Sequence, residues 1–168
     1  MKFNIDGLEA FAKALDDAAN GELRAEFALW LDAMGLEFLD LIQDEIIRTN
    51  TVDTGRLLNS FGKGDKDNVW SISEGKLSLD IGTNVEYASY VNDGHFTIDP
   101  SKGLDRRWVP GVWKGKRFEY TPGADTGMLL KFTWIDGTHY WDNAFAIFER
   151  MFEKSLERRF QEWLDKTF

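Results

Sequence analysis

The stretch IGTNVEYASYVNDG, residues 81–94, decides how the rest of the chain can be arranged. It joins a strand-like run to a Gly-Thr-Asn turn, then to an aromatic segment and a second turn. Gly82 and Asn84 tolerate the positive φ of a tight reversal, and so do Asn92 and Gly94. The β-branched and aromatic residues between the turns fit a pleated, half-buried surface. The stretch therefore predicts a strand followed by two turns, with more sheet or a short helical piece between them.

Hydrophobic periodicity predicts the elements on either side of this stretch. Apolar residues at threes and fours predict helices, and apolar–polar alternation bounded by turn residues predicts strands. The elements expected in chain order are a helix over 6–19, a long helix over 22–48, a short helix over 55–61 capped by Asp53 or Thr54, a hairpin of strands 69–73 and 76–81, a helical piece at 87–91, a strand over 128–135 and a closing helix over 138–166. This order lacks the strand–helix alternation of a parallel sheet. It predicts an α+β fold in which an antiparallel sheet packs against the long N-terminal helix and the C-terminal helix.

Residues 94–123 interrupt the pattern. They contain all three prolines and five of the fifteen glycines, which predicts a long, flexible, Trp-rich loop insertion. Trp108 and Trp113 are too apolar for a free linker, so we expect the insertion to pack on another surface, such as a second subunit. The whole chain is expected to form a single domain over 1–168, with a helical region at 1–50, a sheet region at 51–137 that includes the insertion, and the closing helix at 138–168.

Composition limits the class of protein. The chain has 168 residues, 43% of them hydrophobic, which is enough for a sizeable core. It has no cysteine, so neither a disulfide framework nor a thiolate metal site is available. No apolar run approaches the roughly 20 residues that span a membrane, and the N-terminus lacks a signal pattern, so we expect a protein made and kept in a cytoplasm. The net charge of −9 argues against binding nucleic acid over the whole surface.

The charge is unevenly distributed along the chain. Residues 1–50 hold eleven acidic and four basic residues, a net charge of −7, whereas residues 102–117 hold six basic residues and one acidic residue, a net charge of +5. In an ordinary monomer these would be two solvated faces. In a ring-forming protein they suit a head-to-tail contact between subunits. The residues predicted to form that subunit interface are Arg106, Arg107, Trp108, Trp113, Lys114, Lys116 and Arg117.

The sequence offers no catalytic constellation, cofactor motif or metal site. His95 lies beside Asp93 and Asp99, but one histidine among turn carboxylates is more typical of a turn than of a three-ligand metal centre. The Asp-Thr-Gly sequence at 53–55 follows a helical pattern and precedes another, which favours a helix cap over an aspartic-protease loop. Phosphate-loop and nucleophile-elbow spacings are missing from the sequence. We therefore expect a protein that is not an enzyme and needs no cofactor.

Two segments of the chain resemble a known family. A TGxLxxS segment at 54–60 follows an aspartate, and a G-(T/N)-x-V-x-YA-x-YV-x-x-G segment follows at 82–94. The ending at 134–140, followed by Phe145, fits the same pattern. In this order the segments resemble the neck or tail-completion proteins of long-tailed bacteriophages. The residues that carry the resemblance are Asp53, Thr54, Gly55, Leu57, Ser60, Gly82, Tyr87, Ala88, Tyr90, Val91 and Gly94.

The resemblance implies a structural part of the virion at the head–tail joint, made in the cytoplasm of the bacterial host. Such proteins form rings, commonly hexamers, around the channel through which DNA passes. The implied partners are other copies of the chain and the neighbouring head-completion and tail proteins, with only passing contact with DNA and none with a membrane. An acidic lumen would help DNA to slide rather than to stick.

Two other classes stay open from the residues alone. One is an acidic protein that imitates DNA and inhibits a nuclease or restriction enzyme, using the acidic side of the helix over 22–48. The other is a sugar-binding or hydrolytic phage component, using the Trp-rich stretch. Assays with DNA-binding enzymes and with cell-wall polysaccharide separate these classes from the structural one.

Overall fold

The computed structural model describes residues 1–9, 12–13, 22–51, 55–73 and 77–167. Contacts divide the chain into two compact units. The first, which we name the core unit, combines Met1–Asn92 with Thr138–Phe168. The second, the insertion unit, is Asp93–Gly137. Whether the two behave as a single domain stays a prediction, and each unit is described here by itself.

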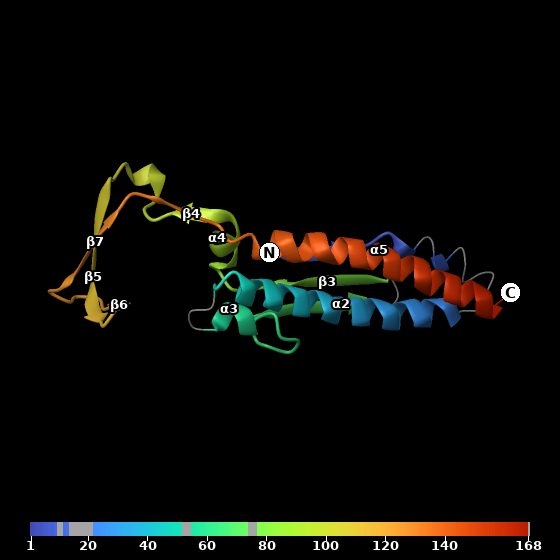
Figure 1. The fold of residues 1–168 in the computed structure, drawn as a ribbon. Helices are drawn as coiled ribbons and strands as arrows, with labels where there is room; N and C mark the ends of the chain where they lie inside the picture. The colour runs from blue at the N-terminus through green and yellow to red at the C-terminus, as the bar shows by residue number, and fades with distance from the viewer. Residues whose placement is uncertain (10–11, 14–21, 52–54, 74–76, 168) are drawn as a thin grey trace. The chain divides into compact units, whose positions relative to one another are not determined.

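The core unit contains two long helices and a three-stranded antiparallel sheet (Figure 1). Helices α2 (Glu22–Arg48) and α5 (Tyr140–Thr167) pack against each other, and α2 also contacts the sheet. The sheet has the order β1-β3-β2, with β1 at Lys2–Ile5, β2 at Asn68–Ser73 and β3 at Ser78–Thr83. Short helices α3 (Arg56–Asn59) and α4 (Ala88–Asp93) flank it in sequence. The predicted α+β fold, with both long helices and the antiparallel sheet, is confirmed.

The centre of the core unit is aromatic. Phe38 of α2 contacts three rings of α5, those of Trp141, Phe145 and Phe148, at centroid distances of 5.3, 6.3 and 4.7 Å. On the sheet side, Gly35 allows α2 to approach closely, because an added β-carbon would lie 2.4 Å from a methyl of Leu79. The apolar stripe predicted for α2 is therefore divided between the partner helix and the sheet.

The insertion unit is built of strands, so the Trp-rich loop expected at 94–123 is wrong, while the flexibility of this segment stays a prediction. β5 (Arg106–Lys114) lies between β6 (Arg117–Tyr120) and β7 (Gly127–Lys131), all antiparallel. β4 (Gly94–Phe96) pairs with β8 (Trp134–Asp136), and a single 3-10 turn, η1, spans Pro100–Lys102. The turn between β5 and β6 consists of Gly115, at φ 64°, and Lys116.

Proline density made the insertion look like a loop. Pro110 nevertheless lies inside β5, at the point where the strand changes partners: it is opposite Gly127 of β7, while Gly111 is opposite Tyr120 of β6. A proline is tolerated in a strand where its missing N–H removes no ladder bond. The Pro110 carbonyl is still used, because it accepts a hydrogen bond from the Thr121 amide at 3.2 Å.

Three local expectations also change. The strand predicted over 128–135 is two strands, β7 and β8, because its two halves pair with β5 and β4 respectively. The position before α3 is Gly55, at φ 76° and without a side-chain cap bond, while Asp53 and Thr54 lie outside the described residues. The helix predicted over 6–19 also falls largely outside them, although residues 8–9 and 12–13 are helical.

Of the turn residues predicted at 81–94, one has the expected positive φ. Gly94 has φ 86°, whereas Gly82 belongs to β3 and Asn92 to α4. Gly82 is needed for another reason, because an added β-carbon there would lie 2.2 Å from the Met1 carbonyl oxygen. The first glycine of the motif therefore makes room for the edge strand β1 rather than for a reversal of the chain.

Candidate interaction surfaces

The first motif segment holds α3 against the sheet. Leu57 and Ser60 are buried, and the Ser60 hydroxyl donates a hydrogen bond to the Leu57 carbonyl at 2.7 Å. Thr83, at the end of β3, donates from its hydroxyl to Ser60 Oγ at 2.8 Å, and its Oγ1 accepts from the Val85 amide at 3.1 Å. These buried bonds give the segment a structural role.

The second motif segment, α4, joins the sheet to the start of α5. The buried Ala88 accepts a hydrogen bond at its carbonyl from the Tyr140 hydroxyl at 3.3 Å. The Val91 carbonyl accepts from the Thr138 amide at 2.9 Å. Tyr87 and Tyr90, by contrast, are exposed, Tyr90 by 58%. Tyr87 lies just before α4, and Ala88, Tyr90 and Val91 lie in it. Of these four motif residues, two therefore fix the fold and two face solvent.

Asn92 has a role that the sequence did not reveal. It is fully buried, its Oδ1 accepts from the Trp141 amide at 2.9 Å, and its Nδ2 donates to Asp142 at 3.0 Å. Its carbonyl also accepts from the His139 amide at 3.0 Å. The first N–H groups of a helix lack intrahelical partners, so Asn92 caps α5 from 49 residues away. From the sequence, Asn92 was interpretable only as a turn residue.

The predicted interface residues lie on two faces of β5, in the turn after it and, for Arg117, at the start of β6. Side chains alternate along β5, so Arg106, Trp108 and Lys114 share one face, whereas Arg107 and Trp113 share the other. All five side chains are exposed. The structure therefore brings the predicted residues into one sheet but divides the two tryptophans between its faces.

Like charges stand directly opposite each other at both ends of β5. Arg106 is opposite Lys131 of β7, and Lys114 is opposite Arg117 of β6. Directly opposed like charges destabilise a strand pair. Both pairs are partly compensated. Arg106 is 3.8 Å from the Asp105 carboxylate, and Lys114 forms an ion pair with Glu119, whose carboxyl pKa is lowered by that hydrogen bond. The ends of this sheet thus hold concentrated positive charge.

The insertion unit leaves most of its large apolar side chains exposed. Ile98 is its one buried large apolar residue. Ten others are exposed, compared with six among the described residues of the core unit. Contiguous exposed apolar surface marks interaction sites in soluble proteins. The ten are Phe96, Leu104, Trp108, Val112, Trp113, Tyr120, Leu129, Phe132, Trp134 and Ile135.

The acidic charge of residues 1–50 is partly neutralised inside the core unit. Glu26 is 3.6 Å from Arg159 and 3.5 Å from Lys166, both on α5. Asp32 pairs with Lys63 at 2.9 Å. Glu45 is buried and bonded to Arg48, a hydrogen bond that lowers the pKa of the Glu45 carboxyl. Among the side chains of α2 whose burial is described, the exposed acidic residues are Glu37, Asp40 and Asp44.

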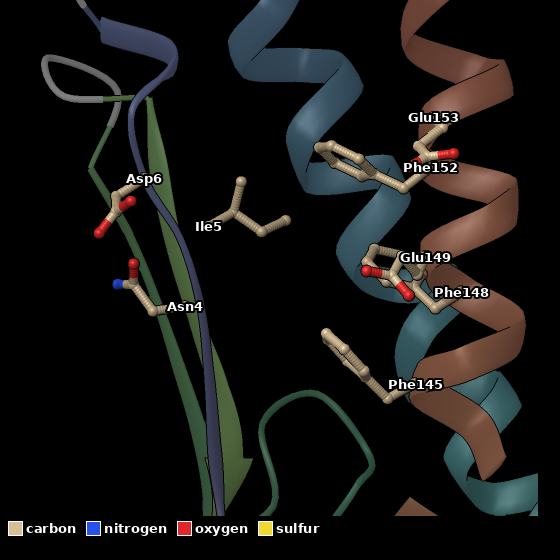
Figure 2. Close-up of a pocket in the computed structure, with 8 residues that line it drawn as sticks. All are labelled: Asn4, Ile5, Asp6, Phe145, Phe148, Glu149, Phe152 and Glu153. Carbon is tan, nitrogen blue, oxygen red and sulfur yellow. The ribbon is translucent and has the colours of Figure 1, made fainter. Parts of the chain in front are cut away.

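A pocket opens between the edge strand β1 and helix α5 (Figure 2). Its volume is about 370 Å³. Ile5 points from β1 toward the helix, and phenyl rings reach back toward β1. The residues that line the pocket are Asn4, Ile5, Asp6, Phe145, Phe148, Glu149, Phe152 and Glu153.

The described residues give no sign of metal chemistry at the histidines. Within those ranges, no three His, Asp or Glu side chains are grouped so that they could hold a metal ion. His95 lies in β4 opposite Ile135, and His139 lies 3.2 Å from Asp142 at the start of α5. None of the helices that the structure describes is long and apolar enough to cross a membrane.

Comparison with known proteins relates the chain to phage tails. Residues 9–94 match the family model described as "Bacteriophage HK97-gp10, putative tail-component". The chain is 64% identical over 165 residues to the uncharacterized protein YqbI of Bacillus subtilis (strain 168), covering 98% of this chain and 99% of YqbI. It is 49% identical over 162 residues to the phage-like element PBSX protein XkdI of the same strain, covering 96% and 98%. No solved structure matches it.

Proposed function

The chain belongs to the HK97-gp10-like family of bacteriophage tail components, and we propose that it is a structural, non-catalytic protein of the head–tail junction. In this proposal, copies of the chain assemble into a ring around the channel through which the phage DNA passes. The other partners are the neighbouring head-completion and tail proteins of the same particle. The protein is made in the cytoplasm of the bacterial host and ends in the virion.

The observation that supports assembly into a ring is the exposed apolar surface of the insertion unit. This unit buries a single large apolar residue and exposes ten, three of them tryptophans. Tryptophan and arginine are the side chains that most often anchor interfaces. A sheet with aromatic residues and cations on both faces is suited to contact a neighbouring subunit.

Charge supports a contact between unlike surfaces. The insertion unit has seven basic and six acidic residues, a net charge of +1, while the rest of the chain carries −10. The basic sheet of one copy is therefore attracted to the acidic core unit of the next. A contact between two different surfaces of the same subunit is heterologous, and such contacts generate rings when the rotation closes. The strongly acidic core unit also repels DNA phosphates, which suits a channel wall.

Mass measurement of the full chain at several concentrations, followed by imaging, tests the proposal. We expect the mass to rise with concentration to one closed assembly, visible as a ring with a central opening. A chain that stays monomeric at every concentration, and that gives no ring in images, would contradict the proposal.

A further inference from the structure

The pocket between β1 and α5 has an apolar floor. Phe148 is almost fully buried, with 1% of its surface exposed, and Phe145 and Phe152 pack partly buried around it. Ile5, exposed by 8%, closes the floor from the sheet side (Figure 2). β1 is an edge strand, so no further strand of the described sheet covers this side. Phe145 and Phe152 are only partly buried, so these two rings leave an aromatic surface that a second molecule can reach.

The rim of the pocket is acidic. Asp6, just after β1, and Glu149 and Glu153 on α5 line the opening, and all three side chains are exposed. None of them forms an ion pair with another described residue, in contrast to Glu26 and Asp32 of the same unit. An aromatic floor with unneutralised carboxylates at its mouth suits a group that combines an aromatic ring with adjacent cations.

The chain itself carries such a group, at the tip of the β5–β6 hairpin. Trp113 is 58% exposed and stands edge-on to Phe118 at a centroid distance of 5.3 Å. Lys114, Lys116 and Arg117 follow it within four residues, around the two-residue turn. One indole ring and three cations thus lie at the end of the β5–β6 hairpin, with Lys116 in the turn and the opposed pair Lys114 and Arg117 on the face opposite Trp113.

We propose that the pocket between β1 and α5 receives Trp113 from a second copy of this chain, with the turn residue Lys116 of that copy facing Glu149 and Glu153. The inference rests on the proposed function, because it names the acceptor surface of the ring contact. The indole would cover the phenyl rings, and the Lys116 cation would meet the carboxylates at the rim. Donor and acceptor are different surfaces of the subunit, as a head-to-tail ring requires.

The other groove of the core unit fits the hairpin tip less well. It lies between α2 and α5 and also has apolar residues, Leu29 and Ala33 among them. Its charged lining is mixed, because Lys154, Arg158 and Arg159 are accompanied by Glu37 and Glu162. The lining of the pocket between β1 and α5 has three carboxylates and no cation. Like charges across an interface disfavour binding, so the basic tip is directed to the acidic pocket on the β1 side of α5.

A disulfide trap tests the contact, since the natural chain has no cysteine. Full-length Lys116→Cys, carrying a mass tag, is mixed with full-length Glu153→Cys and oxidised mildly. We expect a disulfide-linked pair of tagged and untagged chains, formed at least about 10-fold faster than with Arg158→Cys. Arg158 is the matched control because it is exposed on the same helix but lines the other groove. Equal trapping at the two positions, or none at Glu153→Cys, would overturn the inference.

Charge reversal provides an independent readout that does not depend on a cysteine. Lys116→Glu with Arg117→Glu, and separately Glu149→Lys with Glu153→Lys, should each weaken association at least about 10-fold, and mixing the two variants should restore most of it. If both variants form rings of unchanged stability, the proposed contact at the pocket is wrong, whereas the proposed ring is not contradicted. A chain that never assembles and never forms the disulfide would overturn both.

Discussion

Trp108 and Trp113 lie on opposite faces of β5. Five positions separate them in a strand whose side chains alternate, so an odd spacing places them apart. A glycine allows a close approach to an aromatic ring on each face. A β-carbon on Gly127 would lie 2.7 Å from the Trp108 ring. A β-carbon on Gly111 would lie 2.6 Å from the ring of Phe118, which stands beside Trp113. One flat contact cannot bury both tryptophans, so the two faces can be tested separately.

Trp113→Ala should weaken the assembled ring by at least about 1 kcal/mol per contact, because interface tryptophans bury a large area around an oriented N–H group. The dissociation of the ring on dilution, followed by mass, measures the change. Trp108→Ala is the matched control on the other face and should have the smaller effect. If Trp108→Ala weakens the ring more, the joint lies on the opposite face of β5.

Arg106→Glu with Arg107→Glu should slow assembly and reduce its salt dependence. Exposed charges mainly steer the encounter, and salt screens them. Assembly rates measured by light scattering at low and high salt test this. Lys154→Glu with Arg158→Glu makes the same change in charge on α5 and should leave the rate of the ring contact nearly unchanged. Equal slowing by both pairs would mean that net charge alone controls assembly.

Asn92→Ala should lower the free energy of unfolding by about 2 kcal/mol, because it removes the cap of α5 and leaves a buried Trp141 amide without its acceptor. Chemical denaturation of the full chain measures the loss. Gln161→Ala, at an exposed position of α5, should change stability by no more than about 0.5 kcal/mol. Equal effects of the two substitutions would show that the Asn92 bonds add nothing to stability.

Gly35→Ala should destabilise the chain, although alanine is the better helix former by about 1 kcal/mol. The added methyl would lie 2.4 Å from Leu79 and 2.6 Å from Trp70, and overpacking in a core costs about 1–3 kcal/mol. Thermal unfolding gives the sign directly. A rise in the melting temperature would mean that helix α2 does not press on the sheet at this position.

The ion pair of Glu45 and Arg48 should make folding sensitive to acid. The hydrogen bond from Arg48 lowers the pKa of the Glu45 carboxyl in the folded chain below its ordinary value of 4.5. The contribution is therefore fully present above about pH 4.5 and is lost as the pH falls through the lower folded value. Glu45→Gln should flatten the fall of the melting temperature with pH in that range. An unchanged slope would assign the acid sensitivity to other carboxyls.

Local periodicity was enough to predict the long elements. The spacing of apolar residues predicted α2 at Glu22–Arg48 with its observed bounds, and the same signal predicted α5 to within a few residues. The hairpin of β2 and β3 was also predicted, and the helical piece at 87–91 was one of two alternatives, the other being more sheet. Each of these elements buries one side of itself, and that burial leaves a repeat in the sequence whatever the partner is.

Pairing between distant segments was decided only by the tertiary structure. From the sequence, Pro110 favoured a loop, but in the structure it lies where β5 changes its partner strand. Glu26 was expected on a solvent-exposed acidic face of the helix, but in the structure it lies beside Arg159. Asn92 could be recognised as a helix cap only once Trp141 lay next to it.

The pocket between β1 and α5 depends on the same kind of pairing, since about 140 residues separate Ile5 from Phe145 in the sequence. By itself, the sequence determined the two long helices, the hairpin of β2 and β3, the family resemblance and the distribution of charge, because neighbouring residues encode these locally. Only the tertiary structure decided which charges are neutralised, which aromatic rings are left exposed and where an acidic rim surrounds an aromatic floor, because these properties belong to residues that the chain brings together only when it folds.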